Sequence, residues 1–147
     1  MPCSSCRTKP PRAVHRLYLS LGSNLGDRHA LLRQALRLLE ERVGPVERVS
    51  SFIETEPWGF QSEHRFLNAC CLVQTTLTPH QCLAATQAIE RQMGRTRKSH
   101  NGAYHDRPID IDLLYYDDLT LRTPTLTLPH PHIHERDFVL RPLKEIR

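Results

Sequence analysis

The feature that most constrains the fold is an alternation of apolar and acidic residues over 109–113 (IDIDL). Successive side chains of a β-strand point to opposite faces of its sheet, so the three apolar residues would enter a core. Asp110 and Asp112 would then lie together on the other face, about 6–7 Å apart. The pattern therefore predicts a strand over residues 109–116 that is buried on one face and carries two carboxylates on the other.

The rest of the chain alternates predicted strands with two predicted helices. Apolar residues recur at helical spacing in two segments that end at glycines, Gly44 and Gly94. Thr78 and Gln81 can form a capping box at the start of the second helix, and Pro79 suits its first position. Strands are predicted over residues 17–21, 46–53, 67–77 and 109–116, a hairpin over 119–121 and 126–128, and a final short strand or helical turn over 137–146.

This order of elements is β-α-β-β-α-β with an appended hairpin. It favours an α+β fold, a ferredoxin-like α/β sandwich (βαββαβ) with two helices on one antiparallel sheet and with an added β-hairpin and C-terminal extension. The length of 147 residues suits one domain, which we expect over residues 17–147. Residues 1–16 are rich in proline, serine, cysteine and basic side chains, and this composition predicts a disordered tail.

Composition excludes several classes of protein. No apolar stretch approaches the roughly 18–20 residues that cross a bilayer, and the N-terminal segment lacks the apolar region of a secretory signal. We therefore expect a cytoplasmic protein without a membrane partner. The five cysteines are an odd number for a reducing compartment, so no disulfide framework is expected. Cys3 and Cys6 have no neighbouring residues that would complete a metal site.

A basic loop precedes the strand with the two aspartates. It carries Arg95, Arg97, Lys98 and Arg107, and the net charge of the chain is +4. Paired carboxylates repel each other unless a cation lies between them, Mg²⁺ prefers oxygen ligands, and the arginine fork matches phosphate oxygens. The combination favours a magnesium-bound polyphosphate, although a solvated acidic strand beside neutralising arginines would give the same pattern. Residues 22–26 do not form a P-loop, so a nucleotide would need another binding architecture.

Aromatic residues near the predicted third strand are candidates for binding a flat heterocycle. Trp58, Phe60, Phe66 and Asn68 lie close together in the sequence, and Phe138 lies near the C-terminus. Two aromatic rings can hold a planar ring between them, and an asparagine amide can read its edge. Taken singly, the two phenylalanines at 66 and 138 are more often core residues, so both interpretations stay open.

Three histidines alternate with other residues in a proline-containing segment, at His130, His132 and His134. Histidines spaced in this way can face one side of an extended chain and bind zinc. Because no cysteine ligand is near in the sequence, an extended loop with one or two functional histidines is favoured over a zinc site.

Six stretches of the chain, in the same order, resemble the hydroxymethyl-dihydropterin pyrophosphokinase family of folate biosynthesis. They lie at residues 21–27, 54–59, 66–68, 87–97, 107–114, and 128–131 with 136–140. The resemblance implies an ATP-dependent enzyme with two Mg²⁺ ions, which transfers pyrophosphate from ATP to the hydroxyl of 6-hydroxymethyl-7,8-dihydropterin and releases AMP. The chain departs from the family before the aspartates, where residues 104–107 (YHDR) replace the common Trp-Gly-Pro-Arg.

The resemblance also implies roles for individual residues, and it is compatible with a monomer or a weak homodimer. Asp110 and Asp112 would bind the Mg²⁺ ions and would be catalytic together with Arg97 and Arg107. The pterin would be bound by Thr55, Pro57, Trp58, Phe66, Asn68 and Phe138. The nucleotide would be bound by Gln87, Glu90, Arg95, Arg97, Arg107, Ile111, Leu113, Thr127, His130 and Arg136.

Two other functions match parts of the sequence. A basic ferredoxin-like sheet also suits RNA, but residues 69–73 (ACCLV) lack the aromatic side chains of an RNP-type motif, so no nucleic-acid partner is expected. A catalytically silent homologue that binds only pterin or nucleotide is disfavoured, because both aspartates and the nearby arginines are present.

Overall fold

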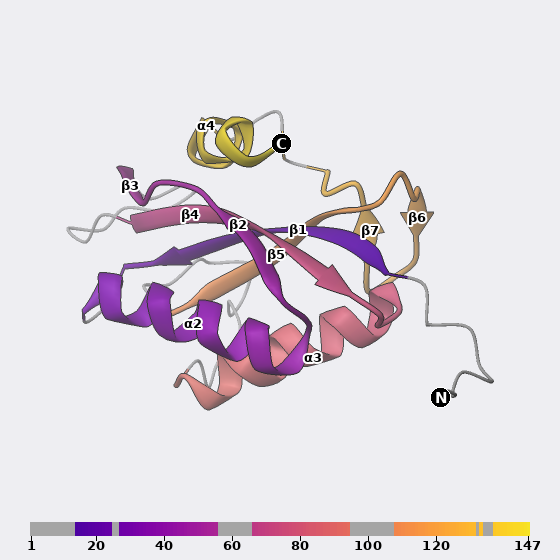
Figure 1. Cartoon of the computed structure of the whole chain (residues 1–147), viewed down its shortest axis with the longest axis horizontal. Helices are drawn as coiled ribbons and strands as arrows, with labels where there is room; N and C mark the ends of the chain where they lie inside the picture. Colours follow the sequence, from indigo (N-terminus) through magenta and orange to yellow (C-terminus); the bar gives the residue numbers. More distant parts are fainter. Residues whose placement is uncertain (1–13, 25–26, 56–65, 95–107, 132, 134–136) are drawn as a thin grey trace, which may run out of the picture.

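The structure is a computed structural model, and it describes residues 14–24, 27–55, 66–94, 108–131, 133 and 137–147. For Thr55, Asp137 and Phe138 it describes the backbone alone. The remaining residues are drawn as a thin grey trace in Figure 1. None of the helices within the described ranges is both long and apolar enough to span a membrane.

The centre of the fold is a five-stranded sheet in the order β2-β4-β1-β5, with β3 also paired to β4. Its strands are β1 (His15–Ser23), β2 (Val46–Val49), β3 (Ile53–Thr55), β4 (Phe66–Thr75) and β5 (Asp110–Tyr116). Every pairing between them is antiparallel. A separate hairpin consists of β6 (Leu121–Arg122) and β7 (Thr127–Leu128).

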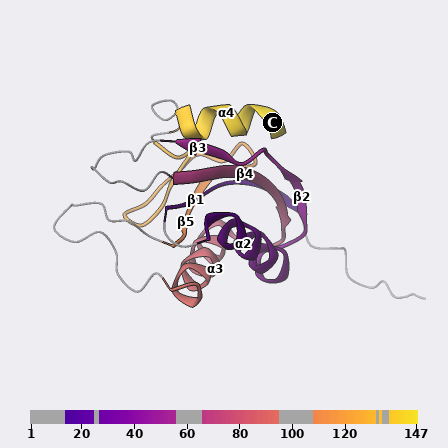
Figure 2. The same ribbon diagram turned by 90° about the vertical axis from the view of Figure 1, so that its left-hand side faces the viewer.

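Helices cover both faces of the sheet. They are α2 (Arg28–Arg42), α3 (Pro79–Gln92) and α4 (Asp137–Ile146). Figures 1 and 2 show α2 and α3 side by side below the sheet and α4 alone above it. The mixed α/β architecture with an antiparallel sheet agrees with the predicted α+β class.

Both predicted helices end just before their glycines, and the second begins where the sequence predicts. The Asp27 side chain accepts a hydrogen bond from the Ala30 N–H at 3.2 Å, and the capping box of Thr78 and Gln81 is present. After α2 the chain passes so close to β4 that a Cβ on Gly44 would lie 1.8 Å from the Gln74 carbonyl oxygen. Only glycine therefore fits at this position, where the chain leaves α2 for β2.

The sheet separates two cores. Successive residues of each strand face opposite sides of the sheet. Leu19 and Leu113 lie in the core between the sheet and helices α2 and α3. Tyr18 and Leu114 lie in the smaller core beneath α4. The sequence indicated the first core from its helical stripes, whereas it gave little sign that the opposite face would also be covered.

Of the two predictions for residues 137–146, a short strand or a helical turn, the helical one is right in type but too short, because the segment forms a ten-residue helix, α4. Its buried residues Val139, Leu143 and Ile146 recur at helical spacing and pack on the sheet. Pro142 lies inside the helix, where it removes a backbone N–H donor. Burial of the apolar stripe outweighs that loss, so the helix continues past the proline.

The predicted single strand over residues 46–53 is wrong, because the chain is interrupted between β2 and β3. At the break, the Ser50 N–H donates to the Cys70 carbonyl at 2.9 Å and the Ser50 hydroxyl accepts from the Cys70 N–H at 2.8 Å. The hydroxyl thus replaces a backbone carbonyl in the ladder, which lets the chain change direction as at a β-bulge.

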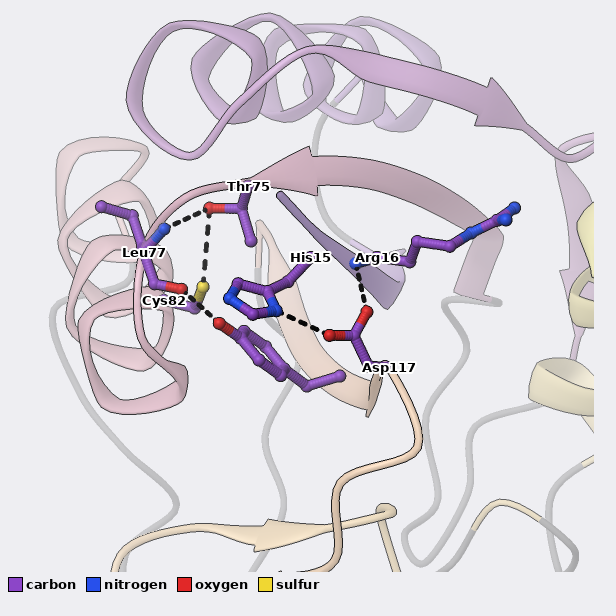
Figure 3. A network of polar contacts seen from close by, with 7 residues as sticks. His15, Arg16, Thr75, Leu77, Cys82 and Asp117 are labelled. Carbon is purple, nitrogen blue, oxygen red and sulfur yellow. Dashed lines mark hydrogen bonds and ion pairs between the residues drawn. The ribbon is translucent and has the colours of Figure 1, made fainter. Parts of the chain in front are cut away.

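β1 begins at His15 rather than at residue 17, and a polar network fixes this end of the strand (Figure 3). His15 Nδ1 lies 2.6 Å from Asp117 Oδ2, and the Arg16 N–H donates to Asp117 Oδ1 at 2.7 Å. The His15 ring stacks on Tyr116, whose hydroxyl donates to the Leu77 carbonyl at 2.6 Å. The network joins the start of β1 to the ends of β4 and β5.

Candidate active site

Three strands bring the predicted aspartates and a predicted pterin residue onto one face of the sheet. Gly22 of β1 lies opposite Asp110 of β5 on one side and opposite Asn68 of β4 on the other. Two residue pairs further along, Ser20 lies opposite Asp112. Directly opposed residues of antiparallel strands share a face, so Asp110 and Asn68 flank Gly22 on the face that α4 covers. Two strand spacings separate their backbones by about 10 Å.

The missing side chain of Gly22 leaves room for its neighbours. A Cβ at this position would lie 2.9 Å from Asn68 Oδ1 and 3.4 Å from Phe66 Cδ1. The Asn68 amide and the edge of the Phe66 ring therefore occupy the space that a side chain at position 22 would fill. The predicted strand ended at residue 21, so this role of Gly22 was missed, although a glycine in a strand is a known sign of close approach.

The two aspartates lie as the alternation predicts. Ile109, Ile111 and Leu113 are buried in the core beneath α2 and α3, whereas Asp110 and Asp112 are half-buried on the other face. Mg²⁺ is commonly held by one or two carboxylates together with water and substrate phosphates, and this pair fits that ligand set.

Within the described ranges, no three or more His, Cys, Asp or Glu side chains are grouped so that they could hold a metal ion by themselves. A site that took part of its ligands from a substrate would need fewer protein groups. Of the three histidines considered for zinc, His132 and His134 lie outside the described residues.

A pocket of about 280 Å³ lies at the free edge of β5. It is lined by Leu83, Ile111, Asp112, Leu113, Pro124, Thr125, Leu126, Thr127, His130 and Pro131. Four predicted nucleotide-binding residues are thus brought together from β5, β7 and the segment after β7, and a predicted metal-binding aspartate joins them. The His130 N–H donates to the Leu114 carbonyl at 3.0 Å, which fastens that segment to β5.

Glu90 of α3 makes a specific contact at the same edge. Its Oε2 accepts a hydrogen bond from the Ile111 N–H at 2.8 Å. Because β1 occupies the other side of β5, this N–H points away from the sheet, and Glu90 provides the acceptor that a further strand would supply. Gln87 is half-buried on the same helix and does not line the pocket.

Sequence comparison places the chain among known proteins. The model of a family described as 7,8-dihydro-6-hydroxymethylpterin-pyrophosphokinase (HPPK) matches residues 18–147. The chain belongs to the HPPK family. The predicted family and enzyme class, a pyrophosphokinase, are therefore confirmed.

Curated relatives of this HPPK chain carry the same name. The 2-amino-4-hydroxy-6-hydroxymethyldihydropteridine pyrophosphokinase of Porphyromonas gingivalis is 55% identical over 131 residues, which are 88% of this chain and 89% of the relative. The protein of that name from Bacillus subtilis is 43% identical over 88% of this chain and 76% of its own length. A "Folate synthesis bifunctional protein, mitochondrial" of Pisum sativum is 38% identical, and there the match covers 97% of this chain but 28% of the relative.

Solved structures agree in fold. The HPPK-DHPS triple mutant of Plasmodium falciparum, crystallised with SDX-DHP, superposes with a TM-score of 0.70 at 17% identity. The match covers 90% of this chain, which spans 40% of that longer polypeptide. At this identity the likeness supports the fold alone.

The remaining predicted site residues of the HPPK chain are not described in full. Pro57, Trp58, Arg95, Arg97, Arg107 and Arg136 lie outside the described residues. The backbone of Thr55 pairs with that of Phe66, and the backbone of Phe138 lies in the first turn of α4. Their predicted roles stay predictions.

Proposed function

We propose that this chain transfers pyrophosphate from ATP to the hydroxyl of 6-hydroxymethyl-7,8-dihydropterin, with release of AMP, in folate biosynthesis. One observation carries the proposal beyond family membership. Asp112 lines the pocket at the edge of β5, and Asp110 lies across Gly22 from Asn68. The aspartate pair therefore lies between this pocket and Asn68, a residue proposed to bind the pterin.

The two substrates would approach the aspartates from different sides. The nucleotide base would occupy the β5-edge pocket among Leu83, Leu113 and Thr127, with its phosphates directed toward Asp112. The pterin would lie against Phe66, with the buried amide of Asn68 reading its edge. Transfer to a primary alcohol depends mainly on alignment of the two reactants, which such an arrangement provides.

Charge neutralisation is the second requirement of the reaction. Asp110 and Asp112 would hold two Mg²⁺ ions, which supply charge stabilisation to the phosphates and lower the pKa of a bound hydroxyl. Arg95, Arg97 and Arg107 would complete the binding of the phosphates, since guanidinium groups pair with phosphate oxygens in a bidentate manner. Water must be kept out, because it would compete with the alcohol as the acceptor.

The finer description of the protein is also a proposal. The sheet order β2-β4-β1-β5 and the two helices on one face support a ferredoxin-like arrangement, with β3 and α4 as additions. We further propose a single domain that includes the whole of β1 from His15 onward, a cytoplasmic location, and a monomer or weak homodimer that acts on small molecules.

An assay of products tests the proposed reaction. The purified protein is mixed with MgATP and 6-hydroxymethyl-7,8-dihydropterin, and the adenine nucleotides are separated and quantified. We expect AMP and pterin pyrophosphate in equal amounts, and no AMP when the pterin is omitted. Formation of ADP in place of AMP, or AMP formation that does not depend on the pterin, would contradict the proposal.

A further inference from the structure

The C-terminal end of α4 is tied to the break between β2 and β3. Glu145 Oε1 accepts hydrogen bonds from both the Ser51 N–H and the Ser51 hydroxyl, each at 2.8 Å. The Arg48 guanidinium adds a bond to the Ile146 carbonyl at 3.3 Å. Ser51 and Glu145 are exposed, so burial of this contact contributes little to stability. Its main effect is to orient the end of α4 relative to the segment between β2 and β3, because hydrogen bonds are directional.

The two elements joined in this way both lead to the proposed pterin site. β3 starts at Ile53, shortly after Ser51, and its last residue pairs with Phe66. α4 starts at Asp137, and the backbone of Phe138 follows in its first turn. The carbonyl of the next residue, Val139, lies 3.7 Å from Cys70 Sγ. Cys70 and Asn68 are alternate residues of β4, so they lie on the same face of the sheet. The contact with Cys70 therefore places the start of α4 next to Asn68.

The contact between Ser51 and Glu145 lies at a comparable distance from the proposed pterin site along both elements. From Ser51 to Thr55 the chain advances about 13 Å at about 3.3 Å per extended residue. From Glu145 back to Phe138 the helix spans about 10 Å at about 1.5 Å per residue. α4 is one continuous helix, so a shift of Glu145 along the helix axis would move the first turn by the same amount. The contact at Glu145 therefore also sets the position of the first turn relative to β3 and β4.

We propose that Ser51 and Glu145 are positioning residues for pterin binding. Their hydrogen bonds hold α4 in register with β3 and β4, and so determine where Phe138 lies relative to Phe66 and Asn68. Neither residue touches the substrate in this arrangement. The proposal rests on the pterin role given to these three residues under the proposed function.

Substitution of Glu145 tests the proposal through separate Michaelis constants. Glu145→Ala removes both hydrogen bonds to Ser51, and we expect the KM for the pterin to rise about three- to tenfold, as loss of one or two hydrogen bonds allows. The KM for ATP should change less than about twofold, because the pocket at the edge of β5 is formed by other elements. Glu145→Gln keeps an acceptor oxygen and should restore the pterin KM to near its original value.

The chain offers a matched control. Glu40 of α2 also accepts a backbone hydrogen bond, from the Val46 N–H at 2.8 Å, on the opposite side of the sheet from α4. Glu40→Ala should lower thermal stability without changing the pterin KM. An equal rise in pterin KM for Glu40→Ala and Glu145→Ala would show general loosening and would overturn the proposal, as would an unchanged pterin KM in Glu145→Ala.

Two further variants separate this proposal from the one on which it rests. Phe66→Ala and Asn68→Ala should each raise the pterin KM if the proposed pterin site is correct. If neither does, both proposals fail. If both variants raise it and Glu145→Ala does not, the pterin site stands and only the positioning role of Ser51 and Glu145 is overturned.

Discussion

Gly22 and Asn68 lie opposite each other on β1 and β4, and a Cβ added to Gly22 would come within 2.9 Å of Asn68 Oδ1. That distance is shorter than a normal van der Waals contact, so any larger residue at position 22 must displace the amide. Asn68 is only 2% exposed and has little room to move elsewhere. The orientation of the Asn68 side chain therefore depends on there being no side chain at Gly22.

We therefore expect Gly22→Ala to raise the KM for the pterin about tenfold, the equivalent of one misplaced hydrogen bond. Asn68→Ala should have a similar effect, because it removes the amide altogether. The double variant should be no worse than either single one, since without the amide the added methyl group displaces nothing. Steady-state kinetics of the three variants measure this coupling, and strictly additive effects would contradict it.

Asp110→Asn and Asp112→Asn should each lower the rate of AMP formation on the order of 10³-fold, since each removes a charge from the proposed metal site. Single-turnover assays with MgATP and the pterin measure the loss. Asp118→Asn is the matched control, because Asp118 is an exposed carboxylate in the turn after β5. A loss below about tenfold in the first two variants would rule out the metal role.

Filling the pocket at the edge of β5 should weaken ATP binding. Leu83 of α3 lines this pocket, so Leu83→Trp is expected to raise the KM for ATP about tenfold while the pterin KM stays within about twofold. Ala84→Trp introduces the same side chain at the next position, which is exposed, and should leave both constants unchanged. If Leu83→Trp raised only the pterin KM, the placement of the nucleotide would be wrong.

Asp117 should make stability depend on pH. Burial raises its pKa, but the hydrogen bonds from Arg16 and His15 and the charges of both residues outweigh burial, so the pKa of Asp117 lies below its ordinary value of 3.8. The carboxylate therefore stabilises the fold above that ordinary value, and the contribution is lost as the pH falls through the lowered pKa.

Asp117→Asn keeps an acceptor for the Arg16 N–H and tolerates the φ of 50° at this position. We expect it to lower the free energy of unfolding at pH 7 by no more than about 1 kcal/mol, because solvent screens the partly exposed pair. The difference should shrink as the pH falls below 3.8 and through the lowered pKa of Asp117. Thermal unfolding curves at several pH values give the result, and a difference that grew on acidification would contradict the assignment.

The described cysteines should be unreactive in the folded protein. Burial raises the pKa of Cys70 to about 12 and of Cys82 to about 11, and it also raises the pKa of Cys71. Since only the thiolate is nucleophilic, alkylation by iodoacetamide at pH 8 should be at least about a hundredfold slower than in urea.

This comparison requires a variant in which Cys3 and Cys6 are replaced by serine, so that only the three buried thiols remain. Mass spectrometry counts the alkyl groups added before and after unfolding. Rapid labelling of one thiol in the folded protein would show that its segment opens readily.

Features that depend on a few neighbouring residues could be predicted from the sequence. The two-residue period placed Asp110 and Asp112 on the face opposite their apolar neighbours, and Thr78 and Gln81 marked the start of α3. Both follow from backbone geometry within one strand or one helical turn, which the rest of the fold does not alter. The order of the motifs was likewise sufficient to assign the family.

Features that depend on distant segments were decided only by the tertiary structure. The row from Asp110 through Gly22 to Asn68 exists because β1 lies between β4 and β5, an order that no local pattern contains. The hydrogen bonds from Ser51 to Glu145 and from Ile111 to Glu90 depend in the same way on how helices pack against the sheet. The sequence by itself determined which side chains could do the chemistry and which face of its own strand each would occupy. The tertiary structure decided which of them meet, because strand order, register and helix packing minimise the free energy of the whole chain rather than of any one segment.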